Sequence, residues 1–190
     1  QVMKEEPKIC HYLDLPIQHA NDTILKRMGR RTSKQELIDI VQKLRKEIPD
    51  ICLRTTLITG FPGETQEQHE EVMEFIDTLE FDRLGAFTYS PEEDTPAATF
   101  EDQIDEEVKE DRQADIMELQ QEIAFDKAED MIGREVLVMI EGKVADENAY
   151  VGRTYRDAPN VDGLIFINTD VELISGDFVK FKVPGALYYD

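Results

Sequence analysis

Residues 54–65 read RTTLITGFPGET, a β-strand pattern that ends in a Gly-Pro-Gly turn and leads into a helix. Thr65 and Gln68 have the spacing of a capping box, so the helix is expected to begin directly after the turn. Glycines in such a turn let the backbone approach a ligand closely. Because α/β proteins bind ligands at the C-terminal ends of their strands, the stretch predicts a small-molecule site at this turn.

Strand and helix patterns alternate through the first ninety residues. Strands are expected over 12–18, 51–59 and 84–90, with capped helices between them. Strands separated by helices of this length pair in parallel through right-handed crossovers. The sequence therefore predicts an α/β fold, part of a barrel or of a doubly wound sheet, since three strands cannot close a barrel.

Side chains alternate along these strands, so the groups that share a face can be named. Asp14 and Gln18 share one face of the first strand, and Arg54 and Thr56 share one face of the second. If helices cover the apolar faces, these four polar side chains lie together. A buried arginine needs a carboxylate partner, which could be Asp14 or a ligand. Both alternatives stay open, and the two can coexist.

The composition changes after Ser90. Residues 91–111 hold ten carboxylates and one lysine, which is typical of a solvated connector or of an acidic contact surface. A helix is expected over about 105–131, with an apolar stripe that packs against the first domain. The stripe comprises Val108, Ile116, Leu119 and Ile123.

Short β patterns separated by turn residues begin at Gly133. They predict a small all-β antiparallel barrel of the OB-like kind, a class of binding module. The expected domains are the α/β part with its acidic connector (1–104), a connecting helix (105–132) and the barrel (133–190). The barrel segment carries six Lys and Arg against ten Asp and Glu, and the whole chain has a net charge of −21. RNA binding relies on cations that neutralise phosphates, so a basic protein is the favoured partner.

Neither the cysteines nor the apolar residues indicate a metal site or a membrane segment. Cys10 and Cys52 are far apart and lack Cys-x-x-Cys spacing, so free thiols are expected. No apolar run approaches the about 20 residues needed to span a bilayer, and no signal-peptide pattern begins at residue 1. We therefore expect a cytoplasmic location and no membrane partner.

Four ordered motifs resemble those of the radical S-adenosylmethionine (radical SAM) methylthiotransferases. They are YLDLPIQH (12–19), GFPGET (60–65), FTYS with the two glutamates that follow it (87–93), and GRT through the DAP…DG run (152–163). The resemblance covers essentially the whole chain, and the terminal barrel corresponds to the TRAM domain of that family. Gln18-His19 and the DAP…DG run are similar to the branch that modifies an aspartate of a small-subunit ribosomal protein.

The resemblance implies a partial radical SAM β/α barrel with parallel strands, followed by the TRAM barrel. It implies two 4Fe-4S clusters in the full-length enzyme and S-adenosyl-L-methionine, which is cleaved to a 5′-deoxyadenosyl radical. A methylthio group is then added to the β-carbon of an aspartate in ribosomal protein S12. S12 or the small ribosomal subunit is the implied partner, and tRNA is less favoured.

The Cys-x-x-x-Cys-x-x-Cys motif that binds the radical SAM cluster in this family does not occur in the sequence. Two separate cysteines cannot replace three thiolates at that spacing. We therefore expect the chain to be the C-terminal part of a larger enzyme and to be inactive alone. No catalytic or metal-ligating residue is assigned to it.

The resemblance, together with position on the strands, implies six cofactor-binding residues. They lie at the amino-carboxylate end of S-adenosylmethionine (Gln18, Arg54), near its ribose or adenine (Thr56, Gly60), and around the same opening (Tyr89, Ser90). His19 is implied as a substrate-binding residue.

Alternatives to these assignments stay open. Tyr89 could equally be a packing residue, and His19 could make only a local hydrogen bond. A tRNA methylthiotransferase would share the α/β motifs, although the acidic balance disfavours it. A non-catalytic TRAM or OB-like binding module would explain the missing cysteines but leaves the polar strand ends unexplained.

Overall fold

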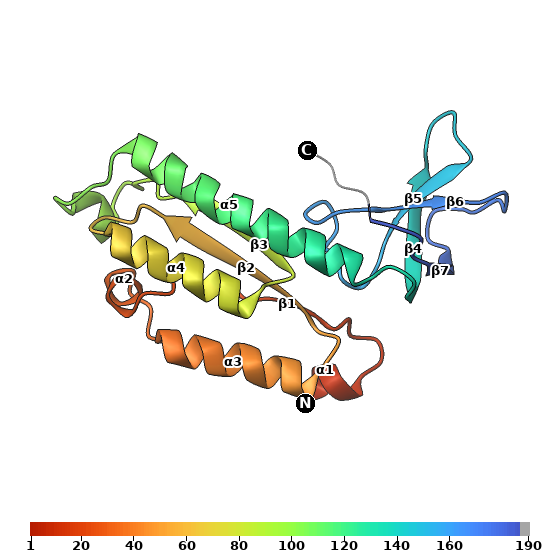
Figure 1. Ribbon diagram of the computed structural model, residues 1–190, viewed down its shortest axis with the longest axis horizontal. Helices are drawn as coiled ribbons and strands as arrows, with labels where there is room; N and C mark the ends of the chain where they lie inside the picture. Colours follow the sequence, from red (N-terminus) through yellow and green to blue (C-terminus); the bar gives the residue numbers. More distant parts are fainter. Residues whose placement is uncertain (187–190) are drawn as a thin grey trace. The chain divides into compact units, whose positions relative to one another are not determined.

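The computed structural model describes residues 1–186 and divides the chain into two compact units (Figure 1). One unit comprises Leu13–Ala124, and the other comprises Gln1–Tyr12 together with the chain from Phe125 onward. The expected boundaries at 104/105 and 132/133 stay predictions.

The first unit is built on a three-stranded sheet with the order β1-β2-β3. Its strands are β1 (Tyr12–Asp14), β2 (Cys52–Thr59) and β3 (Arg83–Thr88). The β2 and β3 strands pair in parallel from Arg54 opposite Arg83 to Thr59 opposite Thr88. This confirms the expected α/β arrangement with parallel strands.

The first strand is shorter than the expected 12–18. It ends at Asp14 and resumes only as an isolated bridge between Gln18 and Leu57. Pro16 has no N–H to donate to a ladder, and Gln18 has a left-handed φ of 73°, which regular strands do not accommodate. The strand pattern is therefore interrupted just before the predicted cofactor-binding glutamine.

The three longer helices of the first unit lie along one side of its sheet (Figure 1). They are α3 (Lys34–Glu47), α4 (Gln66–Leu79) and α5 (Glu106–Glu129), and the shorter elements of the chain are α1 (Val2–Glu5), α2 (Asp22–Arg27) and the 3-10 turn η1 (Pro96–Thr99). Ser33 and Thr65 form capping boxes at α3 and α4, and the box at Thr65 is the one expected from its spacing with Gln68.

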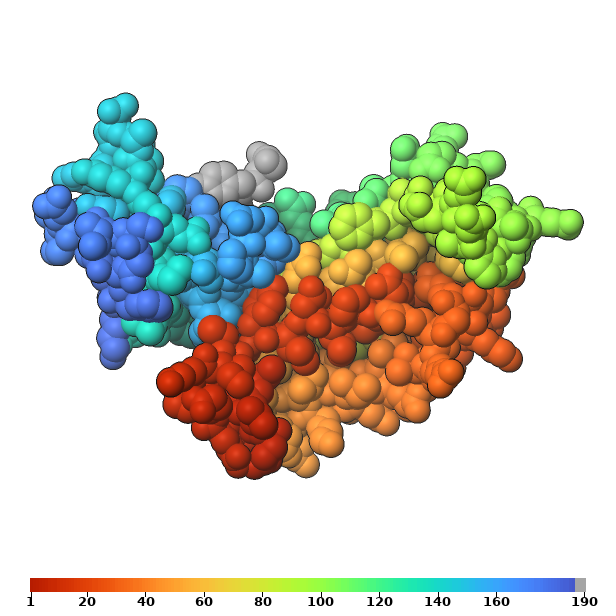
Figure 2. Space-filling view, turned by 180° about the vertical axis from the view of Figure 1, so that it is seen from behind, coloured from red at the N-terminus to blue at the C-terminus, as the bar shows by residue number. Residues whose placement is uncertain are grey.

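Burial distinguishes the two faces of this sheet. Leu53, Thr55 and Leu57 are buried beneath the helices, whereas Arg54 and Thr56 are partly exposed. The opposite view shows the chain segments of the three strands at the surface (Figure 2). One face of the sheet is thus covered by helices and the other is open, and the polar side chains of β2 are on the open face.

The inward face of α5 differs from the expected apolar stripe. Its buried residues are Lys109, Arg112, Ile116, Gln120 and Ile123. Val108, expected in the stripe, is 37% exposed. Three of the five buried side chains are polar, because this helix packs against strand ends whose carbonyl and carboxylate groups need donors. The expected stripe was therefore wrong in the first turn of the helix.

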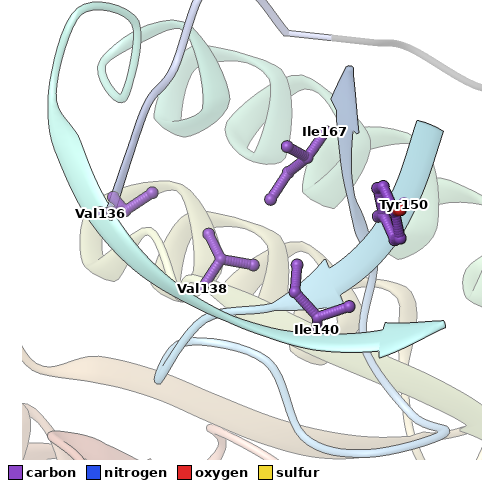
Figure 3. Packing of buried hydrophobic residues seen from close by; sticks show 5 residues of the cluster. All are labelled: Val136, Val138, Ile140, Tyr150 and Ile167. Atoms are coloured by element: carbon purple, nitrogen blue, oxygen red, sulfur yellow. The ribbon is translucent and has the colours of Figure 1, made fainter. Parts of the chain in front are cut away.

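The second unit contains a four-stranded antiparallel sheet with the order β6-β5-β4-β7. Its strands are β4 (Glu135–Lys143), β5 (Ala149–Arg153), β6 (Ile165–Asn168) and β7 (Phe178–Lys182). Alternate residues of β4 point into a core that Tyr150 and Ile167 complete from the neighbouring strands (Figure 3). The sheet curls as expected of a TRAM or OB-like barrel.

A tight packing point of this sheet lies at Gly152, in the GRT motif. A side-chain carbon here would come within 2.6 Å of both the Met139 carbonyl oxygen and the Val138 Cγ1. Glycine is needed at this position because the β4 backbone lies against it.

Candidate functional site

The open face of the β1-β2-β3 sheet carries an ion pair at its centre. Arg54 Nη1 lies 3.2 Å from Asp14 Oδ2, and the two side chains are 18% and 42% exposed. The structural partner expected for Arg54 is thus present, and both groups remain accessible to solvent. An accessible guanidinium can also form a charge-assisted fork with a ligand carboxylate.

Gly85 of β3 lies beside this arginine on the open face. A side-chain carbon at Gly85 would lie 3.7 Å from Arg54 Nη2 and 3.4 Å from the Phe87 ring. The Phe87 ring is 56% exposed on the same face. The open face therefore combines a cation, the partly exposed Thr56 hydroxyl and an exposed aromatic ring, which suits a ligand with a carboxylate, hydroxyl groups and a flat ring.

Gln18 is held at the edge of this face by its backbone. Its N–H donates to the Thr56 carbonyl (2.9 Å), and its carbonyl accepts from Ile58 N–H (2.9 Å). These two bonds hold the left-handed backbone of Gln18 in place. Its backbone therefore lies beside that of Thr56, and its side chain is partly exposed.

Gly60 is buried at the C-terminal end of β2 and has a left-handed φ of 66°. Its N–H donates to Glu64 Oε2 (3.1 Å). A side-chain carbon on Gly60 would overlap the Cγ of Lys109 and lie 3.0 Å from its Cβ. The close backbone approach expected at this glycine is thus made by α5.

Glu64, the glutamate of the GFPGET motif, is the centre of a buried network. Its side chain is 1% exposed, and its Oε1 accepts from Arg112 Nη1 (2.9 Å). Its Oε2 lies 3.2 Å from His19 Nε2 and accepts from the Gly60 N–H. One carboxylate therefore joins the loop after β1, the turn after β2, and α5.

His19 has both ring nitrogens engaged within this network. Its Nδ1 accepts from the Asn21 N–H (2.9 Å), so the ring proton is on Nε2 and points to Glu64. The His19 side chain is 2% exposed. It would have to give up one of these contacts to reach a substrate.

The pKa of the Glu64 carboxyl reflects these partners. Burial raises this pKa, but the hydrogen bond from His19, the charge of Arg112 and the Gly60 N–H outweigh the burial and lower the pKa overall. The carboxyl is therefore ionised at neutral pH, and the network contributes stability that depends on pH.

We expect Glu64→Gln to lower the free energy of unfolding by about 2–3 kcal/mol at pH 7, because Arg112 is left buried without its counter-charge. The deficit should shrink as the pH falls below 4.5, the usual pKa of the carboxyl, since the wild type then loses the charge first in its unfolded state. Urea unfolding at pH 7 and at pH 4 measures this. Glu70→Gln, an exposed change in the helix that follows Glu64, is the control, and a deficit that stays constant with pH would contradict the assignment.

Tyr89 is 9% exposed and packs in an apolar cluster with Ile24 and Phe61. Its ring meets Phe61 edge-on with the centroids 5.1 Å apart, and Lys109 Nζ donates to its carbonyl (3.1 Å). Among the residues described, none is a hydrogen-bond partner of its buried hydroxyl. Ser90, the next residue, is exposed. The structure therefore shows a packed ring whose hydroxyl still has an unmet hydrogen bond.

The open face and the network differ in how well the sequence predicted them. Arg54 pairs with Asp14, one of the two partners that the sequence left open, and the Gln18 backbone bonds to that of Thr56. Glu64, Lys109 and Arg112 were missed as site residues, although Glu64 lies inside the stretch 54–65. The signal available in the sequence was the helical spacing of two cations, Lys109 and Arg112, in an otherwise acidic segment.

The described residues do not supply ligands for an iron-sulfur cluster. Cys10 is exposed and Cys52 is buried, and neither forms a disulfide. Across residues 1–186 there is no group of three or more His, Cys, Asp or Glu side chains that could hold a metal ion. The open face nevertheless offers a guanidinium and a hydroxyl group, which are donor types that a ligand with a carboxylate and hydroxyl groups requires. Within the same residues, no helix is both long enough and apolar enough to cross a membrane.

The outer face of the second unit combines exposed apolar residues with paired cations. Leu137, Phe166 and Phe178 are 54%, 39% and 64% exposed. Lys180 Nζ lies 3.1 Å from Glu135 Oε1, and Arg153 Nε lies 2.7 Å from Glu141 Oε1. Cations already paired with carboxylates are poorly placed to neutralise phosphates. This face therefore offers exposed apolar side chains and cations that already have carboxylate partners.

Family models match both units. Residues 1–76 match the radical SAM superfamily, and residues 132–190 match the TRAM domain. The solved structure of coproporphyrinogen III oxidase (HemN) from Escherichia coli, described as a radical SAM enzyme, superposes with a TM-score of 0.52 at 14% identity. That match covers 76% of this chain and 41% of HemN, and it supports the fold alone.

Curated relatives are more similar in sequence. The ribosomal protein uS12 methylthiotransferase RimO of Lachnoclostridium phytofermentans is 61% identical over 189 residues, which is 100% of this chain and 43% of the relative. The protein of the same name from Desulfitobacterium hafniense is 50% identical, again over 100% of this chain and 42% of the relative. The chain thus spans about two fifths of the length of these relatives.

Proposed function

Because this chain belongs to the radical SAM methylthiotransferases over the part of them that it spans, we propose that its protein modifies ribosomal protein S12. The proposed reaction adds a methylthio group to the β-carbon of an S12 aspartate. The observation that carries the proposal is the 61% identity to a uS12 methylthiotransferase across the whole chain. The partial α/β sheet and the TRAM barrel are consistent with it.

In this proposal the open sheet face binds S-adenosylmethionine. When bound, this cofactor and the iron-sulfur clusters of the full-length enzyme supply the radical chemistry. Arg54 binds the cofactor carboxylate, for which Asp14 is a competing partner, and Thr56 donates to or accepts from the ribose. Gln18, whose backbone lies beside that of Thr56, contacts the amino-carboxylate end. The Gly60 turn and Tyr89 form the wall at the ends of the strands, with Ser90 at its rim.

The second unit and the acidic connector recognise the substrate in this proposal. The chain has a net charge of −21, and the segment 91–111 holds ten of its carboxylates. Long-range attraction would speed the encounter with a basic protein and oppose the approach of RNA. The exposed apolar residues on the outer face of the TRAM sheet then supply short-range contacts.

We expect the chain to bind purified S12 at near-physiological salt and to bind a tRNA anticodon stem-loop at least about tenfold more weakly. Fluorescence anisotropy with labelled S12 and labelled RNA, under the same buffer, gives both dissociation constants. Lys180→Glu is a useful variant because it replaces a cation beside Phe178 with a carboxylate. If the partner is a basic protein, this change should not weaken S12 binding. RNA binding that exceeds S12 binding would instead favour the tRNA-modifying branch.

A further inference from the structure

We infer that Arg112 of α5 is a positioning residue for the cofactor-binding edge: through Glu64, it fixes the Gly60 turn and the His19 ring. The inference rests on the proposed function, because it assumes that this edge of the sheet binds S-adenosylmethionine. It goes further by making α5 part of the site. The match to the radical SAM superfamily ends at residue 76, whereas Arg112 lies well beyond it.

Among the charged residues of the site, Arg112 contacts Glu64. Arg112 Nη1 donates to Glu64 Oε1 (2.9 Å) and to the Glu64 backbone carbonyl (3.1 Å). The two side chains are 8% and 1% exposed, so water screens the pair little. The arginine therefore fixes both the side chain and the backbone of Glu64.

Glu64 transmits this constraint to two segments of the binding edge. Its Oε2 accepts from the Gly60 N–H at 3.1 Å and lies 3.2 Å from His19 Nε2. Gly60 directly follows β2, and His19 follows Gln18, whose own position is set by the bridge to Leu57. A shift of the Glu64 carboxylate would thus move the turn and the residue next to Gln18 together.

A buried ion pair of this kind is a weak source of net stability, because both charges must leave water. Two hydrophobic residues could fill the same space at little or no cost in stability. A fixed carboxylate that satisfies three donors at once does, however, define one arrangement of the edge. This is the reason to assign positioning to Arg112.

The chain offers three informative substitutions. Arg112→Met removes the charge and keeps most of the aliphatic length. Arg112→Lys keeps the charge, and a single ammonium can replace the arginine because both observed bonds come from Nη1. Gln120→Met is the matched control: Gln120 is equally buried on α5 and donates to the Phe81 carbonyl (3.0 Å), just before β3 begins.

The test combines NMR of selectively ¹⁵N-labelled glycine and histidine with calorimetric titration of S-adenosylmethionine in the full-length protein. We expect Arg112→Met to move the Gly60 amide and His19 ring resonances and to weaken binding by about tenfold. Arg112→Lys should keep most of the wild-type resonance positions of Gly60 and His19 and most of the affinity. This variant can be measured even if Arg112→Met fails to fold. Gln120→Met should change neither.

The outcomes that overturn the inference are distinct from those that overturn the proposed function. If Arg112→Met and Arg112→Lys leave the Gly60 and His19 resonances and the affinity unchanged, Arg112 is only structural. If the wild type does not bind S-adenosylmethionine, the proposed function fails. The resonances then still decide whether Arg112 positions the turn, although the turn would serve another ligand.

Discussion

Gly60→Ala is expected to lower the free energy of unfolding of the α/β unit by about 2–4 kcal/mol. One part of the cost is conformational, since φ is 66° and an alanine is disfavoured by about 1–2 kcal/mol in the left-handed region. The other part is steric: the new methyl group overlaps the Cγ of Lys109. Lys109 is 5% exposed and its Nζ donates to the Tyr89 carbonyl, so it cannot move away without breaking that bond.

Gly29→Ala separates the two costs. Gly29 has a similar φ of 77°, but a side-chain carbon there would meet nothing within 4 Å. Its substitution should cost only the conformational part, about 1–2 kcal/mol. Urea unfolding followed by circular dichroism measures both variants. Equal losses for Gly60→Ala and Gly29→Ala would show that α5 does not lie against the turn.

Lys109→Ala tests the same contact from the other side. It removes the Cγ that the new methyl group would overlap, so the double variant should be more stable than the sum of the two single losses predicts. A coupling energy of about 1 kcal/mol or more is expected for side chains in direct contact. No coupling would place the cost of Gly60→Ala in the backbone alone.

The fold was largely predictable because its signals are local. Capping boxes at Ser33 and Thr65 and the alternation of apolar residues along β2 depend only on neighbours in sequence. The shortening of β1 was not predicted, although Pro16 already marked a position without an N–H donor. The inward face of α5 was also missed, since a helix stripe that contains Lys109 and Arg112 departs from simple amphipathic spacing.

The residues of the site also divide into those that local sequence patterns predict and those that only long-range packing brings together. The sequence predicted Asp14 as one possible partner of Arg54, because both belong to strand patterns in which alternation shows the residues that share a face. The network of Glu64 was not predicted, because it depends on a contact between residues 48 positions apart in the sequence. A glutamate at a helix start is ordinarily a solvated end group. Only the three-dimensional packing shows that this one is buried and satisfied.

Arg54→Ala is expected to weaken S-adenosylmethionine binding by about 30- to 100-fold, because a charge-assisted fork to the cofactor carboxylate is lost. Calorimetric titration of the full-length protein measures the change. Arg83→Ala is the matched control: Arg83 is the β3 neighbour of Arg54 in the register, and its Nη1 donates to the adjacent Asp82 carbonyl (3.1 Å). An equal loss in both variants would indicate only a general effect of positive charge.

Asp14→Asn decides between the two roles that the sequence left open for Arg54. If Arg54 serves only the structural pair, removal of either partner leaves the affinity for S-adenosylmethionine unchanged. Stability then falls only slightly, because the Asp14 side chain is 42% exposed and exposed ion pairs contribute little. If Arg54 binds the cofactor, Asp14→Asn removes a carboxylate that competes with the cofactor carboxylate for the guanidinium. Affinity should then fall with Arg54→Ala but hold or rise with Asp14→Asn. These opposite responses cannot come from a purely structural pair, so the two variants together test the open face as a cofactor site.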